Sequence, residues 1–258
     1  MSQPVVFKIG GEALLEKEAL LKFLSVIKIV HGARPVVIVH GGGPQVENMM
    51  AATGVPTTKV DGVRTTPLNQ LPFIVGALAG VASQQLLAAT KQVGIKAVSL
   101  SLSDSDLFEA KPKQANLGAV GQVEPGKATA IEALMRAGNL VLINSIGCDE
   151  HGQTLNINAD DAAVATAKLL NAQLCLLSNV PGVLDEEKQL ISHLDQTQIH
   201  SLVIKGVISD GMVVKVNAAL QAARYLRRPV NIGSWQQPMA MHHMVNAEHC
   251  QLGTQILP

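Results

Sequence analysis

The sequence predicts an α/β protein, a three-layer α/β/α sandwich with a mainly parallel central sheet and additional β-hairpins. Short runs of Val, Ile and Leu alternate with segments of helical periodicity along the chain, as βαβ units require. The runs are apolar at nearly every position, which is typical of strands buried on both faces. With 258 residues, 47% of them hydrophobic, the chain can also bury a large core.

Six apolar runs are predicted strands, and six segments of helical periodicity are predicted helices. The strands are Val5–Ile9, Pro35–Val39, Ala97–Leu102, Leu140–Ile143, Leu174–Leu177 and Val230–Ile232. The helices are Ala13–Val30, Gln45–Thr53, Asn69–Gln92, Ala128–Ala137, Asp160–Leu170 and Met212–Arg227. Ligands of such sheets bind at the carboxyl ends of the strands, so we expect the functional site there.

Three segments interrupt this alternation and predict β-hairpins. Asp104–Val123 is too long and polar for a simple connection and contains short strand-like pieces. Gly147–Leu155 and Val183–Ile191 each have a polar turn at their tip. Because no repeat, low-complexity tract or linker is visible, we expect one domain over residues 1–258. Within it we expect two functional lobes, about 1–170 and about 171–258, each for a different ligand.

Composition and charge argue against several classes of protein. The 20 basic and 20 acidic side chains give a formal net charge of zero, so no basic field attracts nucleic acid or an anionic membrane. Aromatic residues, at 2%, are too few for base-stacking surfaces. The apolar stretch Leu71–Ala82 contains Pro72 and Gly76 and is too short to span a bilayer. The first strand leaves no room for a signal peptide, so we expect a cytoplasmic protein without membrane or nucleic-acid partners.

Cysteine and histidine usage predicts no metal centre. Cys148, Cys175 and Cys250 are odd in number and widely separated, which indicates reduced thiols instead of disulfides or metal ligands. The eight histidines show no ligand spacing, and the adjacent His242 and His243 are poorly placed to share one metal ion.

Two glycine-rich turns follow the first two predicted strands. The first, Lys8-Ile9-Gly10-Gly11, begins with a lysine, and the second, His40-Gly41-Gly42-Gly43, precedes a helix. Converging backbone N–H groups and the charge of Lys8 suit an anion such as phosphate. Three consecutive glycines exceed what a plain tight turn needs, which favours close approach of a ligand. We interpret His40 as a structural histidine.

A second lysine-containing glycine segment has a misleading spacing. Gly121–Ala128 matches the glycine and lysine positions of a nucleotide-binding P-loop. However, Ala128 stands where a hydroxyl would bind magnesium, and Pro125 removes a backbone donor. We interpret Lys127 as a solvated residue near a helix start.

Arg64 lies immediately before a long apolar helix, in Asp61–Pro67. An arginine there suits bidentate capture of a carboxylate, and a surface salt bridge is an equal alternative. We expect Thr65 or Thr66 to cap the helix, with Pro67 in its first turn.

Two later segments also carry polar groups of interest. In Asn156–Asp161, Asn158 is a plausible helix N-cap, which leaves Asn156 and one aspartate without a structural reason. Ser178–Val183 follows a buried strand and is suited to wrap a nucleotide. Lys215 lies among valines one turn inside a helix, which indicates a partly buried face.

Five of these motifs, which follow one another along the chain between Val5 and Leu257, resemble those of the amino acid kinase family. Within that family the likeness is to members that phosphorylate N-acetyl-L-glutamate in arginine biosynthesis. The resemblance implies transfer of the γ-phosphoryl group of ATP to the side-chain carboxylate of that substrate. The motifs are Lys8–Gly11, His40–Gly43, Gly62–Thr66, Asn156–Asp160 and Asp210–Lys215.

The resemblance also implies roles for individual residues. Lys8 and Lys215 would stabilise the transferring phosphoryl group, Asp160 would hold both ammonium groups, and the N–H groups of Gly11 and Gly43 would complete the cradle. Gly42 and Gly43 would contact the acceptor, whose α-carboxylate Arg64 and Asn156 would hold. ATP, with Mg²⁺ held mainly through the phosphates, would be bound in the C-terminal lobe. The implied ATP contacts are Asn179, Val180, Pro181, Gly182, Val183, Leu184, Val207, Ile208, Ser209, Asp210, Gly211, Met212, Val213, Val214 and Lys215.

Other functions stay open at this point. The acceptor could be a related compound such as N-acetyl-aminoadipate, a carbamate or glutamate, or the chain could be a non-catalytic amino-acid sensor. A dinucleotide oxidoreductase lacks its Gly-x-Gly-x-x-Gly turn. Family members inhibited by arginine carry an additional N-terminal helix that links dimers into a hexamer. This chain starts about four residues before its first strand, so we expect an arginine-insensitive homodimer with Asn69–Gln92 at its interface.

Overall fold

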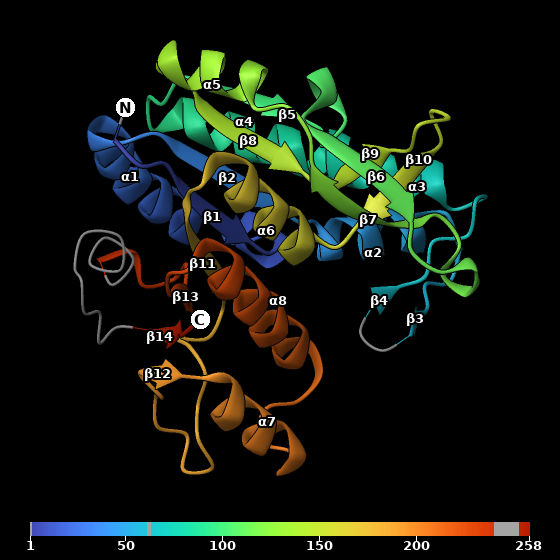
Figure 1. The fold of residues 1–258 in the computed structure, drawn as a ribbon. Helices are drawn as coiled ribbons and strands as arrows, with labels where there is room; N and C mark the ends of the chain where they lie inside the picture. The colour runs from blue at the N-terminus through green and yellow to red at the C-terminus, as the bar shows by residue number, and fades with distance from the viewer. Residues whose placement is uncertain (1, 61–62, 240–252) are drawn as a thin grey trace.

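The computed structural model describes residues 2–60, 63–239 and 253–258. Its main sheet has eight strands in the order β12-β14-β13-β11-β1-β2-β8-β5 (Figure 1). Neighbouring strands are parallel except β13 and β14, which are antiparallel. In sheet order the strands are β12 (His193–Leu194), β14 (Thr254–Ile256), β13 (Val230–Ser234), β11 (Gln173–Ser178), β1 (Val5–Ile9), β2 (Val36–His40), β8 (Leu140–Asn144) and β5 (Ala97–Leu100).

The six predicted strands all lie in this sheet, with ends displaced by at most two residues, so the mainly parallel sheet is confirmed. The short edge strands β12 and β14 were not predicted. They contain two and three residues, too few to show the periodicity that identifies a strand.

Side chains of the central strands alternate between two hydrophobic cores. Val5 and Phe7 pack into one core with residues of α1 (Lys17–Ala33) and α4 (Ser83–Gln92). The other core contains Val6, residues of three further helices, and Ile199 of α7 (Gln196–Ile204). Figure 1 shows two of these, α6 and α8, in front of the central strands. Helices therefore cover both faces, and the three-layer sandwich is confirmed. The three helices are α5 (Thr129–Arg136), α6 (Ala159–Leu170) and α8 (Asp210–Leu226).

A second, four-stranded sheet has the order β6-β7-β10-β9. Its two antiparallel hairpins, β6–β7 and β9–β10, confirm two of the three predicted hairpins. Strands β7 and β10 join the hairpins in parallel and place Asn156 opposite Val120. The strands are β6 (Phe108–Pro112), β7 (Val120–Pro125), β9 (Ile146–Cys148) and β10 (Thr154–Ile157).

The third predicted hairpin, Val183–Ile191, is not formed by strands. One bridge joins Leu184 to Leu190, and the turn between them is held by a side chain. The Asp185 carboxylate accepts hydrogen bonds from the backbone N–H groups of Glu187 and Gln189, at 2.9 and 2.8 Å. Backbone hydrogen bonds also close the reversal, from the Asp185 N–H to the Gln189 carbonyl and from the Ile191 N–H to the Val183 carbonyl, both at 2.9 Å.

The long apolar segment forms one helical run, α3 (Leu71–Val75), the π-helical η2 (Gly76–Ala82) and α4. Leu71–Gln92 is 22 residues long, so by length and composition it could cross a membrane, as core helices of soluble proteins also could. The prediction that the apolar segment is too short to span a bilayer took in only Leu71–Ala82, the part of this run formed by α3 and η2. Its residues Ile74, Leu78 and Leu86 are buried inside the protein.

The predicted cap of this helix is wrong. Gln70, not Thr65 or Thr66, is the residue at the N-cap of α3. The backbone N–H of Thr66 donates to the Leu117 carbonyl at 2.8 Å, and its own carbonyl accepts from Ala119 at 2.7 Å. These bonds hold Thr66 against the second sheet, away from the helix.

The remaining elements connect the two sheets and the C-terminal half. The helix α2 (Gly43–Ala52) packs against α3 and η2 through Val46 and Met50. The helix α7 (Gln196–Ile204) follows β12 and was not predicted. The other short elements are η1 (Gly11–Leu14), β3 (Lys59–Val60), β4 (Val63–Arg64), η3 (Asp104–Asp106) and η4 (Ala115–Leu117).

Candidate active site

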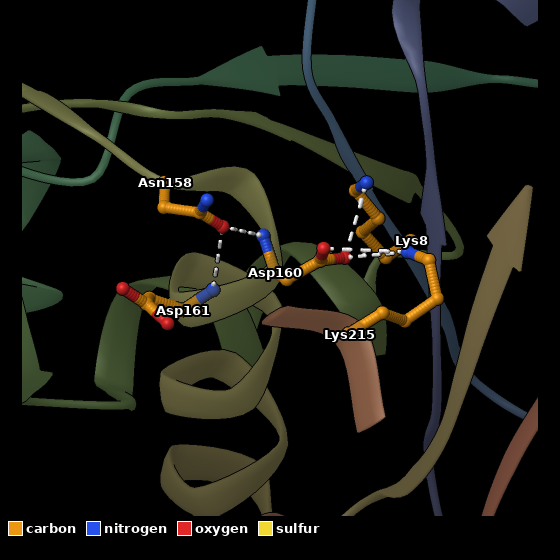
Figure 2. Close-up of polar contacts among 5 residues, drawn as sticks. All are labelled: Lys8, Asn158, Asp160, Asp161 and Lys215. Carbon is orange, nitrogen blue, oxygen red and sulfur yellow. Dashed lines mark hydrogen bonds and ion pairs between the residues drawn. The ribbon is translucent and has the colours of Figure 1, made fainter. Parts of the chain in front are cut away.

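Three charged side chains from distant parts of the sequence meet at the carboxyl end of β1. Lys8 follows Val6 by two positions on β1, so its side chain points toward the face covered by α6 and α8. Its Nζ lies 3.0 Å from Oδ1 of Asp160, at the start of α6. The Nζ of Lys215, on α8, lies 3.1 Å from the same oxygen and 3.3 Å from Oδ2 (Figure 2). One carboxylate thus bridges two ammonium groups.

The start of α6 positions this carboxylate. The side chain of Asn158 accepts hydrogen bonds from the backbone N–H groups of Asp160, at 2.7 Å, and Asp161, at 3.3 Å (Figure 2). Asn158 is therefore the N-cap, as predicted. The cap places Asp160 in the first helical turn, where the helix dipole favours an ionised carboxylate. Asp161 also has a structural partner, because its carboxylate lies 3.5 Å from Nζ of Lys113.

The cluster carries a net charge of +1 when all three groups are ionised. Burial raises the pKa of Asp160, but the neighbouring ammonium groups of Lys8 and Lys215 outweigh it and lower the pKa to about 2. Burial, followed by repulsion from Lys8, lowers the pKa of Lys215 to about 8, although Asp160 offsets part of this shift. An anion bound beside the cluster would neutralise the excess positive charge.

A cavity of about 240 Å³ lies beside the cluster and is lined by Lys8 and Asp160. Both glycine turns also line it, as does β10. Its position at the carboxyl ends of β1 and β2 is the one expected for a ligand site in a parallel sheet.

The two glycine turns are packed against each other. A Cβ atom on Gly11 would lie 2.7 Å from the Cα of Gly42, which leaves no room for a side chain. A Cβ on Gly42 would lie 2.7 Å from Cδ2 of Leu78. Gly43 is the first residue of α2, and a Cβ there would meet no atom within 4 Å. The first N–H groups of a helix have no partner within the helix, so this turn offers donors to an anion.

Arg64 has one guanidinium nitrogen in an ion pair and another without a partner. Its Nη2 donates to Oε1 of Glu47 at 2.6 Å, and Oε2 of Glu47 accepts from the Thr57 hydroxyl at 2.7 Å. Its Nη1 is buried with no hydrogen-bond partner, and Arg64 lines the cavity. A salt bridge, the alternative to carboxylate capture, is therefore present, although the Arg64 side chain is only 11% exposed, and a donor for a carboxylate ligand remains.

Asn156 lines the same cavity from β10. Its Nδ2 donates to the Thr66 hydroxyl at 3.0 Å, which fixes the orientation of the amide. The structure thus brings together, around one cavity, the predicted residues Lys8, Gly11, Gly42, Gly43, Arg64, Asn156 and Asp160.

No residue of the two segments expected to contact ATP lines this cavity; Lys215 is connected to it through its ion pair with Asp160. Asn179–Leu184 follows the carboxyl end of β11, and Val207–Lys215 leads into α8. Two positions in the first segment have structural reasons of their own. A Cβ on Gly182 would collide with the Thr254 hydroxyl, and the N–H of Val183 donates to that oxygen at 2.8 Å.

Other predicted features lie away from the cavity. Lys127 is exposed and pairs with Asp106 at 3.1 Å, in a turn after β7 that does not belong to the central sheet. Cys148 and Cys175 form no disulfide, and the sulfur of Cys175 accepts a hydrogen bond from Nδ2 of Asn231 at 3.8 Å. In the part of the chain that the structure describes, no group of three His, Cys, Asp or Glu side chains could hold a metal ion. Five residues named above, Asp61, Gly62, His242, His243 and Cys250, lie outside the described residues.

Sequence reasoning missed several residues of the cavity and its support. Ser145 follows the carboxyl end of β8, so the rule that ligands bind at strand ends could have found it. Glu12 follows the first glycine turn and also lines the cavity. Glu47 and Gln45 lie in the first turns of α2 and have no recognisable sequence pattern.

Curated relatives match this chain over nearly its full length. An acetylglutamate kinase of Vibrio cholerae is 44% identical over 99% of this chain and 97% of the relative. An acetylglutamate kinase of Proteus mirabilis is 41% identical over 99% of both chains.

A solved structure has the same fold. The protein smu.665 from Streptococcus mutans UA159 superposes with a TM-score of 0.84 at 29% sequence identity, covering 100% of this chain and 99% of the other. A model of the amino acid kinase family matches residues 3–234. These matches, together with the glycine turns and the bridged lysines, show that the chain belongs to the amino acid kinase family.

Proposed function

We propose that the chain is an acetylglutamate kinase. It transfers the γ-phosphoryl group of ATP to the side-chain carboxylate of N-acetyl-L-glutamate, which gives N-acetyl-L-glutamyl 5-phosphate and ADP in arginine biosynthesis. Identities of 41–44% over almost the whole length to proteins of that name support this substrate. The observation that carries the proposal is the carboxylate of Asp160, which bridges the ammonium groups of Lys8 and Lys215 beside the cavity.

Both reactants are anions, so positioning and charge stabilisation supply most of the catalysis. A carboxylate oxygen of the acceptor forms a bond to the γ-phosphorus while the bond from that phosphorus to the bridging oxygen of ADP breaks. Lys8 and Lys215 neutralise the charge on the transferring group, and the N–H groups of Gly11 and Gly43 donate to its oxygens. The acceptor carboxylate is already ionised at neutral pH, so the reaction needs no general base.

The N-terminal lobe, about residues 1–170, binds the acceptor. Arg64, through its unpartnered Nη1, and Asn156 hold the α-carboxylate, while Gly42 and Gly43 contact the group to be phosphorylated. A guanidinium nitrogen that is buried without a partner gains most from a carboxylate ligand, because the ligand supplies the missing charge-assisted hydrogen bond.

The C-terminal lobe, about residues 171–258, binds ATP through Asn179–Leu184 and Val207–Lys215. Mg²⁺ would be held mainly by the phosphates, whose charge it would neutralise. The donor set fits this arrangement. Glu12 and Asp160 supply the carboxylates that line the cavity. The carboxylate of Asp160 already forms ion pairs with two lysines. Glu12 has no ion pair among the described residues and would supply the protein's carboxylate toward the ion.

We also propose that the protein is a cytoplasmic homodimer that uses Asn69–Gln92 in its interface. Exposed apolar side chains on and beside this segment, Val81 and Leu68, support such a contact. Sedimentation equilibrium tests the state of assembly, and a monomer or a hexamer at micromolar concentration would contradict it.

The test of the function is an ATP-dependent hydroxamate assay, which traps the acyl phosphate directly. We expect product with N-acetyl-L-glutamate and much less with N-acetyl-L-aminoadipate, L-glutamate or carbamate. The reverse preference would contradict the proposed acceptor, and no trapped product from any of them would contradict the activity.

The variant Lys8→Ala separates an enzyme from a sensor. By analogy with the loss of one oxyanion donor, we expect turnover to fall by about 10²–10³-fold. Binding of N-acetyl-L-glutamate, measured by calorimetry, should persist. A wild-type protein that binds the amino acid and forms no product would instead be a sensor.

A further inference from the structure

The mechanism above gives no role to His40, although this residue lies directly before the second glycine turn. His40 ends β2 and is fully buried. Its Nδ1 lies 3.0 Å from the carbonyl oxygen of Gly41, and its Nε2 lies 3.2 Å from the hydroxyl of Ser83. Asn144 donates to the same hydroxyl at 3.4 Å and to the Leu100 carbonyl at 3.1 Å. A chain of neutral hydrogen bonds therefore ends at the glycine turn.

The contacts determine which ring nitrogen carries the proton. A carbonyl oxygen can only accept, so Nδ1 is the donor to Gly41 and Nε2 is an acceptor. The Ser83 hydroxyl lies within reach of both Nε2 and the Leu78 carbonyl, at 3.2 and 3.1 Å. That carbonyl already accepts the backbone N–H of Ser83, whereas Nε2 has no other donor in the described part of the chain. Burial lowers the pKa of His40 to about 4, so the ring is neutral at physiological pH.

One hydrogen bond to Gly41 also orients the next amide. The Gly41 carbonyl and the Gly42 N–H belong to one peptide plane, and the described chain contains no cis peptide bond. In a trans peptide the C=O and N–H bonds point in opposite directions. Drawing the Gly41 carbonyl toward His40 therefore turns the Gly42 N–H away from the ring, and both glycines line the cavity.

The rest of the turn is held by other bonds. The Gly41 N–H donates to the Ile9 carbonyl at 3.1 Å, and the Gly42 carbonyl accepts from Val46 at 2.9 Å. Without the His40 contact, the peptide between Gly41 and Gly42 could rotate, because glycine restricts the backbone so little. The π-helical η2 supports the same place, since it presents Leu78 to Gly42 and ends beside Ser83. Single π-turns are frequent at functional sites.

We propose that His40 is a positioning residue, whose Nδ1–H holds the Gly41 carbonyl so that the Gly42 N–H faces the anion in the cavity. Ser83 and Asn144 hold the ring in the required tautomer and orientation. The proposal deepens the proposed function, on which it rests for the identity of that anion as the transferring phosphoryl group.

Two substitutions at His40 separate positioning from packing. In His40→Asn the amide nitrogen can occupy the place of Nδ1 and still donate to Gly41. In His40→Leu that donor is lost while an apolar side chain fills the site. We expect His40→Leu to lower kcat by about 100-fold, as the loss of an oriented oxyanion donor does, with KM values changed less than about threefold. His40→Asn should recover kcat to within about tenfold of wild type. Equal kcat for the two variants would overturn the proposal.

A direct readout is the amide resonance of Gly42 in a ¹⁵N–¹H spectrum. Inorganic phosphate should shift this resonance in the wild type and in His40→Asn, and shift it much less in His40→Leu. An equal shift in all three proteins would overturn the proposal. A phosphate-dependent shift in a wild-type protein that forms no acyl phosphate would retain the role of His40 and refute the proposed function.

Two further variants control for stability. Thr90, on α4, is also buried, and its hydroxyl donates to the Leu87 carbonyl at 2.7 Å; it is not among the residues that line the cavity. Thr90→Val should lower the free energy of unfolding without lowering kcat, and a kcat loss equal to that of His40→Leu would overturn the proposal. If His40→Leu does not fold, Ser83→Ala takes its place. It should lower kcat by about tenfold at unchanged KM, and an unchanged kcat would count against the network.

Discussion

Two buried polar clusters lie at the same end of the central sheet, and they differ in charge. Lys8, Asp160 and Lys215 are ionised, and their side chains remain 8–12% exposed. His40 and Ser83 belong to a neutral cluster that is at most 2% exposed. Charge is therefore retained where an anionic ligand can approach, and the fully enclosed support of the glycine turn is built from neutral hydrogen bonds.

The difference in charge between the two clusters has a simple physical reason. An enclosed charge without a partner is far more costly than an enclosed hydrogen-bonded amide or imidazole. In the ionised cluster, Asp160 compensates two lysines only in part, which leaves one positive charge for a ligand to neutralise. In the neutral cluster no ligand arrives, so every group is satisfied by the protein itself.

The largest expected effect comes from removing the shared carboxylate. Asp160→Asn leaves two buried ammonium groups facing each other, and we expect the free energy of unfolding at pH 7 to fall by about 3–5 kcal/mol. Urea denaturation measures it. Asp161→Asn is the matched control, because its pair with Lys113 is about one-third exposed and should contribute less than about 1 kcal/mol. A similar loss in the free energy of unfolding for both variants would contradict the claim that Asp160 compensates two buried ammonium groups.

The acid stability of the protein should separate the two clusters by pH. Burial lowers the pKa of His40 from 6.5 to about 4, so the unfolded chain takes up this proton first. Stability is therefore lost as pH falls from 6.5 to 4, by about 3 kcal/mol for the 2.5-unit shift. The pKa of Asp160 is lowered from 3.8 to about 2, so its contribution of about 2 kcal/mol is lost between those values.

Urea denaturation at a series of pH values measures both steps. His40→Asn should remove the first step, and Asp160→Asn should remove the second. A first step that persists in His40→Asn would show that another group titrates there.

The ionised cluster should also set the alkaline limit of activity. The pKa of Lys215 is lowered to about 8, so the free enzyme loses this positive charge at higher pH. We expect kcat/KM to fall about tenfold per pH unit above that value, since this ratio reports the free enzyme. Lys215→Arg, although slower, should keep its charge and show no such decline below pH 10. A parallel decline in both proteins would assign the titration elsewhere.

The smallest effect is expected at an exposed ion pair. The side chains of Lys127 and Asp106 are 73% and 78% exposed, so Lys127→Ala should change the free energy of unfolding by less than about 0.5 kcal/mol. The rate of acyl-phosphate formation should be unchanged. A tenfold loss of rate would instead mean that the P-loop-like spacing around Lys127 takes part in nucleotide binding.

Much of the fold could be predicted because its signals are local. The buried strands can be identified from their apolar runs. Asn158 could be recognised as a helix N-cap from its position before two aspartates. The helix α7 could also have been found, because Asp195 and Gln198 form a capping box. Strands β12 and β14 could not, since pairing partners far along the chain define them.

The candidate site likewise contains features that the sequence shows locally and features that depend on tertiary contacts. The glycine turns and the lysine at the start of the first are visible in the sequence, but the salt bridge between Glu47 and Arg64 depends on how α2 lies beside β4. The expected cap at Thr66 failed because long-range bonds to Leu117 and Ala119 outcompete a local helix start. Tertiary contacts of this kind leave no local pattern.

The pairing of β1 with β11 has a consequence for the two reactants. Lys8 is in register with Leu176, which lies two residues before Ser178, the last residue of β11. Neighbouring strands in a sheet are about 4.8 Å apart, and the hydrogen-bonded ladder keeps that spacing constant. In the proposed function the acceptor is bound beside β1 and ATP after β11, so this ladder would set the spacing between the two sites. A movement that closes them would then come from the loops above the sheet, because the paired strands cannot separate without breaking the ladder.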